Sequence, residues 1–234
     1  MKYMGSKNRI AKHILPIILK DRKEGQWYVE PFVGGANMID KVGGNRIGGE
    51  VNEYIAEMWI ALEAGWTPRS DYTREEYKYI KANQDKDRKL SGYVGVNCSY
   101  SGVWFTGYAG ITQTKGGVRD YQEEAFRNVQ AQSPNIKGVD FKHAGYDTLE
   151  IPESSLIYCD PPYANTSGYK DSFNHADFWQ WCREKKVEGH TIFISEYNAP
   201  EDFTCVWEKE VKSSLSANGK GGASKSSTEK LFTL

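Results

Sequence analysis

A short apolar stretch that ends in two prolines constrains this chain most strongly. Residues 156–159 read Leu-Ile-Tyr-Cys, which is typical of a buried strand, and Asp160-Pro161-Pro162-Tyr163 follow directly. Proline cannot donate a hydrogen bond to a sheet ladder and it restricts the residue before it, so the strand must end at Asp160. Open α/β sheets hold their ligands at the carboxyl ends of their strands. The stretch therefore predicts an α/β fold with Asp160 at a ligand-binding edge.

These four residues also suit one reaction, the direct methylation of an exocyclic amino group. The N6 nitrogen of adenine is a poor nucleophile because its lone pair is delocalised, and it carries two N–H donors. The Asp160 carboxylate and the Pro161 carbonyl could accept both donors, which would free the lone pair to attack. The Tyr163 ring offers a face on which a base can stack. Taken alone, the residues are equally typical of an ordinary loop, because Pro and Asp are common in turns.

The first third of the chain has the pattern of a nucleotide-cofactor site. A predicted strand at 26–31 is followed by Gly34 and Gly35, and a second predicted strand at 46–50 ends in Glu50. Glycines at a strand-to-helix turn let a ligand approach the backbone, and an acid at the tip of the second strand holds a ribose diol in dinucleotide folds. The glycines do not form G-x-G-x-x-G, which disfavours a nicotinamide cofactor and leaves another adenosine-bearing cofactor open.

Residues 65–133 differ in character from the flanking sequence. Two charged helical stretches, at 74–81 and 121–131, bracket a segment at 93–108 that is rich in Gly, Tyr, Ser and Asn. We interpret the region as an insertion that contacts DNA bases and phosphates. The candidate contact residues are Tyr100, Ser101, Lys115 and Arg119. A packed irregular lobe with a glycine-rich hairpin is the alternative.

The α/β pattern resumes after Pro134. Strands are predicted at 138–141, 191–195, 206–211 and 231–234, and helices at 8–20, 51–63 and 175–186. The polar segments at 164–173 and 213–228 predict loops, the first ordering on substrate and the second mobile.

Charge and cysteine content limit the classes of partner. The net charge is −1, so nucleic acid must be bound by local basic patches rather than by a global field. The 4 cysteines are widely spaced and form no C-x-x-C pair, which predicts neither a zinc site nor a disulfide framework. No apolar run of signal-peptide or membrane length follows Met1. We expect a cytoplasmic protein without a metal or a membrane partner.

The motifs, read in order, resemble those of the D12-class (alpha-group) DNA adenine-N6 methyltransferases. The resemblance is carried by Gly5-Ser6-Lys7, Phe32-Val33-Gly34-Gly35, Glu50 and Asp160-Pro161-Pro162-Tyr163. It spans nearly the whole chain and includes Ser195-Glu196-Tyr197-Asn198 and the terminal Glu229-Lys230-Leu231-Phe232. It implies a Rossmann-like S-adenosylmethionine-dependent methyltransferase sheet in a catalytic domain of residues 1–64 and 134–234. Residues 65–133 fall where this family carries a target-recognition domain, expected to be mainly helical. The compact size is similar to that of bacteriophage members.

The resemblance also implies roles for single residues. Tyr3 and Lys7 would contact S-adenosylmethionine, with Lys7 at its methionine end; Phe32, Gly34 and Gly35 would line the cofactor pocket; Glu50 would bind the ribose; Asp160 would contact both cofactor and target amine. Two positions depart from the family pattern. Glu50 stands where Asp is more usual, and the acid-aromatic pair before the catalytic strand is replaced by Gly145-Tyr146. The second departure weakens the expectation of contacts from that loop to the cofactor's adenine.

The implied activity is methyl transfer to an adenine that is flipped out of double-stranded DNA and stacked on Tyr163, with S-adenosylhomocysteine as product. Asp160, Pro161 and Tyr163 are the expected catalytic residues. We expect a monomer in a bacterial cytoplasm, encoded by the bacterium or a phage, alone or within a restriction-modification system. The alternatives are N-methylation of RNA or of protein glutamine, and a DNA-binding relative that has lost catalysis.

Overall fold

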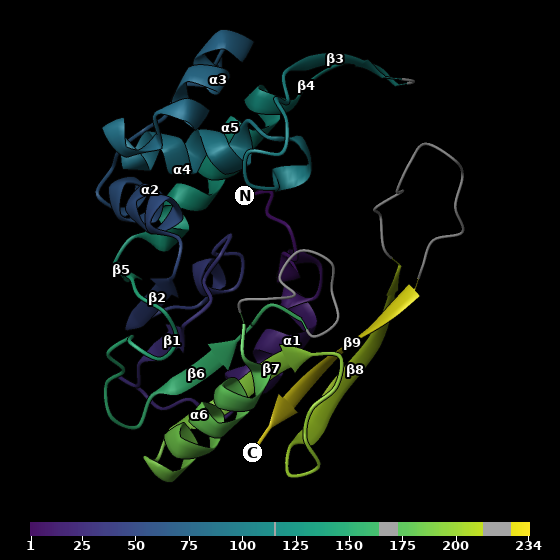
Figure 1. Ribbon diagram of the computed structural model, residues 1–234. Helices are drawn as coiled ribbons and strands as arrows, with labels where there is room; N and C mark the ends of the chain where they lie inside the picture. The colour runs from purple at the N-terminus through teal and green to yellow at the C-terminus, as the bar shows by residue number, and fades with distance from the viewer. Residues whose placement is uncertain (115, 164–172, 213–225) are drawn as a thin grey trace.

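The computed structural model describes residues 1–114, 116–163, 173–212 and 226–234. Its centre is a seven-stranded sheet in the order β5-β2-β1-β6-β7-β9-β8 (Figure 1). The strands are β1 (Tyr28–Glu30), β2 (Arg46–Glu50), β5 (Val139–His143), β6 (Leu156–Cys159), β7 (Thr191–Glu196), β8 (Thr204–Lys212) and β9 (Ser226–Thr233). The first five pair in parallel, and β9 lies antiparallel between β7 and β8. This mixed α/β architecture is consistent with a methyltransferase fold.

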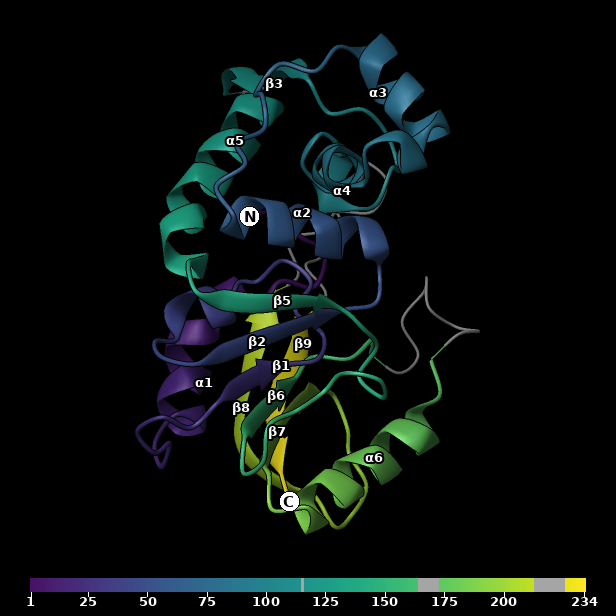
Figure 2. The same ribbon diagram turned by 90° about the vertical axis from the view of Figure 1, so that its left-hand side faces the viewer.

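The strand that ends at the two prolines occupies the middle of the sheet. Leu156 and Tyr158 join the core on one face, whereas Ile157 and Cys159 join the core on the other. Helix α1 (Ala11–Ile18) covers the first face and α6 (His175–Val187) the second (Figure 2). Because both faces are covered, every residue of β6 is apolar, as in buried parallel strands.

The predicted strands agree with the structure except at the C-terminus. The predicted closing strand began at Leu231, whereas β9 begins at Ser226. It is longer because it pairs along the whole of β8, from Thr204 opposite Thr233 to Lys212 opposite Ser226. Of the two predicted loops, residues 164–172 and 213–225 lie outside the described part of the chain, so the expected ordering and mobility stay predictions.

The remaining helices lie beyond the β5 edge of the sheet. They are α2 (Glu53–Glu63), α3 (Arg74–Ala82), α4 (Arg88–Asn97) and α5 (Tyr121–Gln132). Helix α2 lies between β5 and α4 in both views (Figures 1 and 2). The hairpin of β3 (Ile111–Thr114) and β4 (Gly117–Asp120) projects away from α5 (Figure 1). Caps define the helix starts: the Asn52 side chain accepts from the first turn of α2, and Thr73 with Glu76 forms a capping box on α3.

The interpretation of residues 93–108 as a base-reading surface is wrong for the first half of that segment. Residues 91–99 are buried, and most of them belong to α4. Their glycines serve close packing, since a Cβ at Gly92 would lie 2.0 Å from the Tyr54 carbonyl oxygen and one at Gly95 would lie 2.5 Å from the Trp104 ring. The alternative, a packed lobe, describes this half, and the hairpin begins only at Ile111. Within the described residues, no helix has the length and apolarity needed to cross a membrane.

Candidate functional site

Acidic side chains gather at the carboxyl edge of the sheet. Glu30 ends β1, Glu50 ends β2, Glu196 ends β7, and Asp160 directly follows β6. Parallel pairing brings these strand ends to one edge. Glu30 and Glu196 are buried, at 3% and 1% exposure. Carboxylates in such surroundings need cations or hydrogen-bond donors to remain ionised.

Lys7 supplies the cation. Its Nζ atom lies 2.9 Å from Oδ1 of Asp160, and its side chain is only 8% exposed. The Ser6 hydroxyl caps the short 3-10 helix Lys7–Arg9 by accepting from the Asn8 N–H. The segment therefore has an ordinary N-cap at Ser6, but Lys7 is buried and is not part of a solvated basic face. Burial lowers the pKa of Lys7, but Asp160 and Glu229 outweigh it and the net pKa is raised.

Asp160 has a raised pKa chiefly because it is buried. Burial raises the pKa of Asp160 to about 6; Lys7 opposes the rise, whereas repulsion from Glu229 and Glu196 adds to it. The group is therefore mostly ionised at pH 7 to 8, where a carboxylate is an acceptor only. Below about pH 6 the Asp160 carboxyl is mostly protonated and can also donate a hydrogen bond.

Tyr163 is held against this pair by a residue from the end of the chain. Its hydroxyl donates to Oε2 of Glu229 on β9 at 2.8 Å. Lys7 Nζ lies 4.5 Å from the centroid of the Tyr163 ring, and Tyr197 contacts the ring edge-on with centroids 4.6 Å apart. The resemblance extends to Glu229 but implies no role for it, although its two-residue spacing from the buried Leu231 places both on one face of the strand.

The glycine turn is shaped around Tyr3. Gly34 has φ +44°, and a Cβ there would lie 2.8 Å from Cε1 of Tyr3. A Cβ at Gly35 would lie 2.6 Å from Cβ of Tyr3, so a side chain at either position would displace the tyrosine. The Ser6 N–H donates to the Tyr3 carbonyl at 3.2 Å, which closes the turn that leads to Lys7. The glycine turn and Asp160 are far apart in the sequence, but the same N-terminal segment contacts both of them.

Glu50 is fixed beside the same turn. One of its carboxylate oxygens accepts from the Gly34 N–H at 3.1 Å and the other from the Asn52 N–H at 2.9 Å. Burial raises the pKa of Glu50 to about 7, and these backbone donors limit the rise. Val51 is a third backbone donor to this carboxylate, and the lone pairs that remain can accept from a hydroxyl group. The turn itself is pinned by Trp59, whose Nε1–H donates to the Gly34 carbonyl at 2.8 Å.

Phe32 lies in a different side-chain cluster from Tyr3. Its ring stacks on Tyr146 with centroids 5.5 Å apart, and it meets Phe173 and Phe178 edge-on. This cluster packs on the α6 face of the sheet, whereas Tyr3 packs on the α1 face. The structure does not bring Phe32 against Tyr3. It does place Tyr146, the aromatic residue of the altered pair, directly beside Phe32.

The candidate DNA-contacting residues lie in the region of α3 to α5. Tyr100 is 66% exposed, and Ser101 is exposed beside it in the short helix Tyr100–Gly102. Arg119 on β4 contacts the Tyr121 ring, and its Nη2 lies 2.8 Å from Glu124. Lys115 lies outside the described residues. A phosphate contact at Arg119 would have to share the guanidinium with Glu124.

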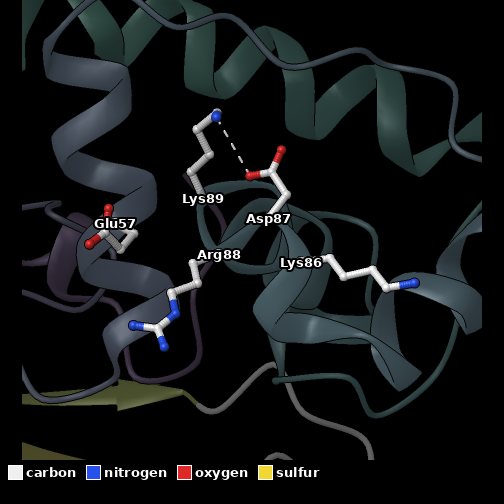
Figure 3. A pocket seen from close by; sticks show the side chains of 5 residues that line it. All are labelled: Glu57, Lys86, Asp87, Arg88 and Lys89. Carbon is white, nitrogen blue, oxygen red and sulfur yellow. Dashed lines mark ion pairs between the residues drawn. The ribbon is translucent and has the colours of Figure 1, made fainter.

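A surface pocket lies apart from the carboxyl edge. It has a volume of about 390 Å³ and is lined by Glu57 and residues 86–89 (Figure 3). Its cations already have partners: Lys86 donates to the Tyr79 hydroxyl at 2.7 Å, and Lys89 pairs with Asp87 at 3.6 Å. Arg88 pairs with Glu53 at 2.8 Å. Each cation of this pocket therefore already has a polar partner. In the described part of the chain, no His, Cys, Asp and Glu side chains form a group that could hold a metal ion.

Comparison with known proteins identifies the family. Residues 3–198 match the family described as D12 class N6 adenine-specific DNA methyltransferase. The chain is also similar to the type II methyltransferase M.FokI of Planomicrobium okeanokoites, with 24% identity over 213 residues. That similarity covers 80% of this chain and 32% of the relative, so the chain spans about a third of the length of this curated relative.

Proposed function

This chain belongs to the D12 class of N6 adenine-specific DNA methyltransferases, and we propose that it transfers a methyl group from S-adenosylmethionine to N6 of adenine in double-stranded DNA. S-Adenosylhomocysteine is the second product. One observation supports this activity above the others. The N-terminal segment packs Tyr3 on the Gly34-Gly35 turn and pairs Lys7 with Asp160, so the predicted cofactor and catalytic residues share one edge of the sheet.

The residues of this edge fit the proposed cofactor. Glu50 keeps lone pairs that can accept from the ribose, as described above. The Lys7 ammonium has three donors, and its described hydrogen bonds, to the Gly5 carbonyl at 3.1 Å and to Asp160, leave a third for a carboxylate. When bound, S-adenosylmethionine supplies an electrophilic methyl group on a positively charged sulfur. The acids at this edge favour that charge.

Asp160 and Pro161 activate the target nitrogen. The ionised Asp160 carboxylate and the Pro161 carbonyl accept the two N–H groups of N6, which frees the nitrogen lone pair to attack. S-Adenosylmethionine, held by Lys7, Glu50 and the Gly34-Gly35 turn, would supply the methyl group that this lone pair takes up. N6 then loses one proton, and Asp160 is a base positioned to accept it. The adenine must leave the duplex stack first, which costs a few kcal/mol that stacking on Tyr163 offsets in part.

We propose that the inserted region binds the DNA. We take residues 65–133 as the target-recognition domain and residues 1–64 and 134–234 as the catalytic domain. Ile111 and Val118 on the β3–β4 hairpin are each 73% exposed, which is unusual for such large apolar residues. The hairpin also carries Arg119, and with Tyr100 and Ser101 it forms the proposed DNA-contacting surface. Lys115, which lies outside the described residues, is a further candidate for a DNA contact.

The experiment is expression of this chain in a host that lacks DNA methylation, followed by mapping of N6-methyladenine in the host DNA. We expect modification at one short sequence, and none when Asp160→Asn or Asp160→Ala is expressed. The purified protein with a labelled methyl donor should modify unmethylated DNA when DNA, RNA and protein are offered in parallel. Label in RNA or protein alone, or cofactor binding without any methylated product, would contradict the proposal.

A further inference from the structure

An acid outside the region matched to the family completes the site. Glu229 lies on β9, beyond residue 198 where the family match ends. We propose that Glu229 is a positioning residue for methyl transfer, which holds the Tyr163 ring and the Lys7 ammonium where the target adenine requires them. This inference deepens the proposed function and rests on it.

Sheet topology explains how a C-terminal residue reaches the catalytic edge. β9 runs antiparallel to β7, with Lys230 opposite Glu196, the last residue of β7. Residues before Lys230 therefore extend past the carboxyl end of β7. Glu229 is the first of them, and its side chain is 14% exposed. If β9 ran parallel to β7, the C-terminal end of β9 would lie at this edge, and Glu229 would lie at the opposite one.

One oxygen atom of Glu229 is shared by both neighbours of Asp160. Oε2 accepts the Tyr163 hydroxyl at 2.8 Å and lies 3.9 Å from Lys7 Nζ. Lys7 in turn lies 2.9 Å from Asp160 and over the Tyr163 ring. Removing the carboxylate takes the acceptor from the Tyr163 hydroxyl and one of the two anions from Lys7. Both groups can then shift, and a misplacement of about 1 Å near reacting atoms can lower a rate about a hundredfold.

The charge of Glu229 also acts on Asp160. Lys7 faces Asp160 from the N-terminal segment, Glu229 faces it from β9, and Glu196 acts on it from β7. Glu30 on β1 and Tyr158 on β6 interact with it as well. Lys209 is opposite Glu229 on β8, and its amine lies 3.0 Å from His13. Because Glu229 repels Asp160, neutralising Glu229 should lower the pKa of Asp160 and move the acid limb of activity to lower pH.

The experiment is a double-mutant cycle on methyl transfer, with Glu229→Ala, Tyr163→Phe and the pair combined. We expect Glu229→Ala to lower kcat about ten- to a hundredfold. The double variant should be no slower than the slower single variant, because both remove the same hydrogen bond. Glu229→Gln keeps an acceptor for Tyr163, so it should lose less activity while its acid limb moves to lower pH. Glu210→Gln, an exposed acid on β8, is the matched control and should leave the rate and the pH profile unchanged.

The outcomes separate this inference from the proposed function. A wild-type chain that methylates DNA, with additive losses in the cycle or an unmoved acid limb in Glu229→Gln, overturns the positioning role alone. The positioning role is also overturned if Glu229→Ala keeps full activity and only its melting temperature falls, because Glu229 would then have a structural role alone. A wild-type chain that methylates no DNA overturns the proposed function and this inference together. If Glu229→Ala fails to fold, the pH profile of Glu229→Gln is the test. An acid limb at lower pH supports the positioning role, and an unmoved limb overturns it.

Discussion

At the scale of single residues, the site depends on carboxylates whose ionisation is set by burial. Asp160 is 21% exposed and Glu50 is 8% exposed, and both have a raised pKa. Each is proposed to accept hydrogen bonds, from the target amine and from the ribose respectively, and neither can do so fully when protonated. Activity and cofactor binding should therefore respond to pH at different values.

We predict that kcat/KM for DNA falls as the pH is lowered through about 6. The pKa of Asp160 is raised to about 6, so below that pH the group is protonated and loses an acceptor for the N6 hydrogens. By linkage, a raised carboxyl pKa adds stability at low pH that is lost as the pH rises through 6, so this group does not make the protein unfold in the assay range. The measurement is a pH profile of methyl transfer. A profile that stays flat down to pH 5 would contradict the assignment.

The second prediction concerns cofactor affinity and Glu50. Its pKa of about 7 means that S-adenosylhomocysteine should bind more weakly as the pH falls through 7. Glu50→Gln should weaken binding at least about tenfold, because a hydrogen bond to a charged group contributes about 1.5–3 kcal/mol and the new amide points N–H groups at the Gly34 or Asn52 N–H. Calorimetric titration measures both effects.

Glu57→Gln is the control for this prediction, since Glu57 is exposed on the adjacent helix α2. It should bind the ligand as the unchanged protein does. Equal affinity of Glu50→Gln and Glu57→Gln would remove Glu50 from the cofactor site.

At the scale of elements, the glycine turn is closely packed, whereas the β3–β4 hairpin exposes large apolar side chains. The turn after β1 is packed from several sides: Tyr3 lies on it, Trp59 donates to the Gly34 carbonyl, and Gln132 donates to the Gly35 carbonyl at 3.1 Å. The hairpin exposes Ile111 and Val118. Substitutions in the turn should therefore affect folding and cofactor binding together, whereas substitutions in the hairpin should affect DNA alone.

Gly35→Ala tests the turn. The new Cβ would lie 2.6 Å from both Tyr3 Cβ and Asn37 Nδ2, so backbone or side chains must shift, at a cost of about 1–3 kcal/mol. We expect a lower melting temperature and weaker binding of S-adenosylhomocysteine. Gly43→Ala is the matched control, because a Cβ there meets nothing within 4 Å. If both variants behaved alike, close packing against Tyr3 would not be what this turn requires.

Serine substitutions test the hairpin. Ile111→Ser and Val118→Ser remove apolar surface that is already exposed, so the melting temperature and cofactor affinity should stay unchanged. DNA affinity, measured by fluorescence anisotropy with a duplex that contains the mapped site, should fall several-fold. Val187→Ser, at a position 89% exposed on α6, should leave DNA affinity intact. Unchanged DNA binding in both hairpin variants would place the DNA elsewhere.

At the scale of the whole molecule, the proposed cofactor should couple the two ends of the chain. Its site draws on the N-terminal segment, on the ends of β1, β2 and β6, and through Tyr163 on β9. A ligand that binds only the folded state adds about 2.7 kcal/mol at a hundred times its Kd. For a chain of this size we therefore expect S-adenosylhomocysteine to raise the melting temperature by roughly 5–10 °C. NAD at the same concentration should not, and an equal shift with NAD would argue for a general nucleotide site.

Much of the fold was predictable because the decisive signals are local. The prolines end β6, and the strands predicted at 26–31, 156–159 and 191–195 are found at 28–30, 156–159 and 191–196. Periodicity failed in residues 91–99, where small and polar residues suggested an exposed surface. There Gly92 and Gly95 permit close contact with neighbouring elements, which a local pattern cannot distinguish from a flexible loop.

In the candidate site, too, some features follow from local sequence and others only from the tertiary structure. The sequence alone determined that Asp160 ends a buried strand, that Gly34 and Gly35 form a turn, and that the order of these motifs resembles one family, because each depends on neighbours along the chain. Only the tertiary structure decided that Lys7 is buried against Asp160 and that Glu229 holds Tyr163. Those contacts depend on the antiparallel strand β9 and on an N-terminal segment that crosses the sheet edge, and pairing between distant segments leaves no local pattern to read.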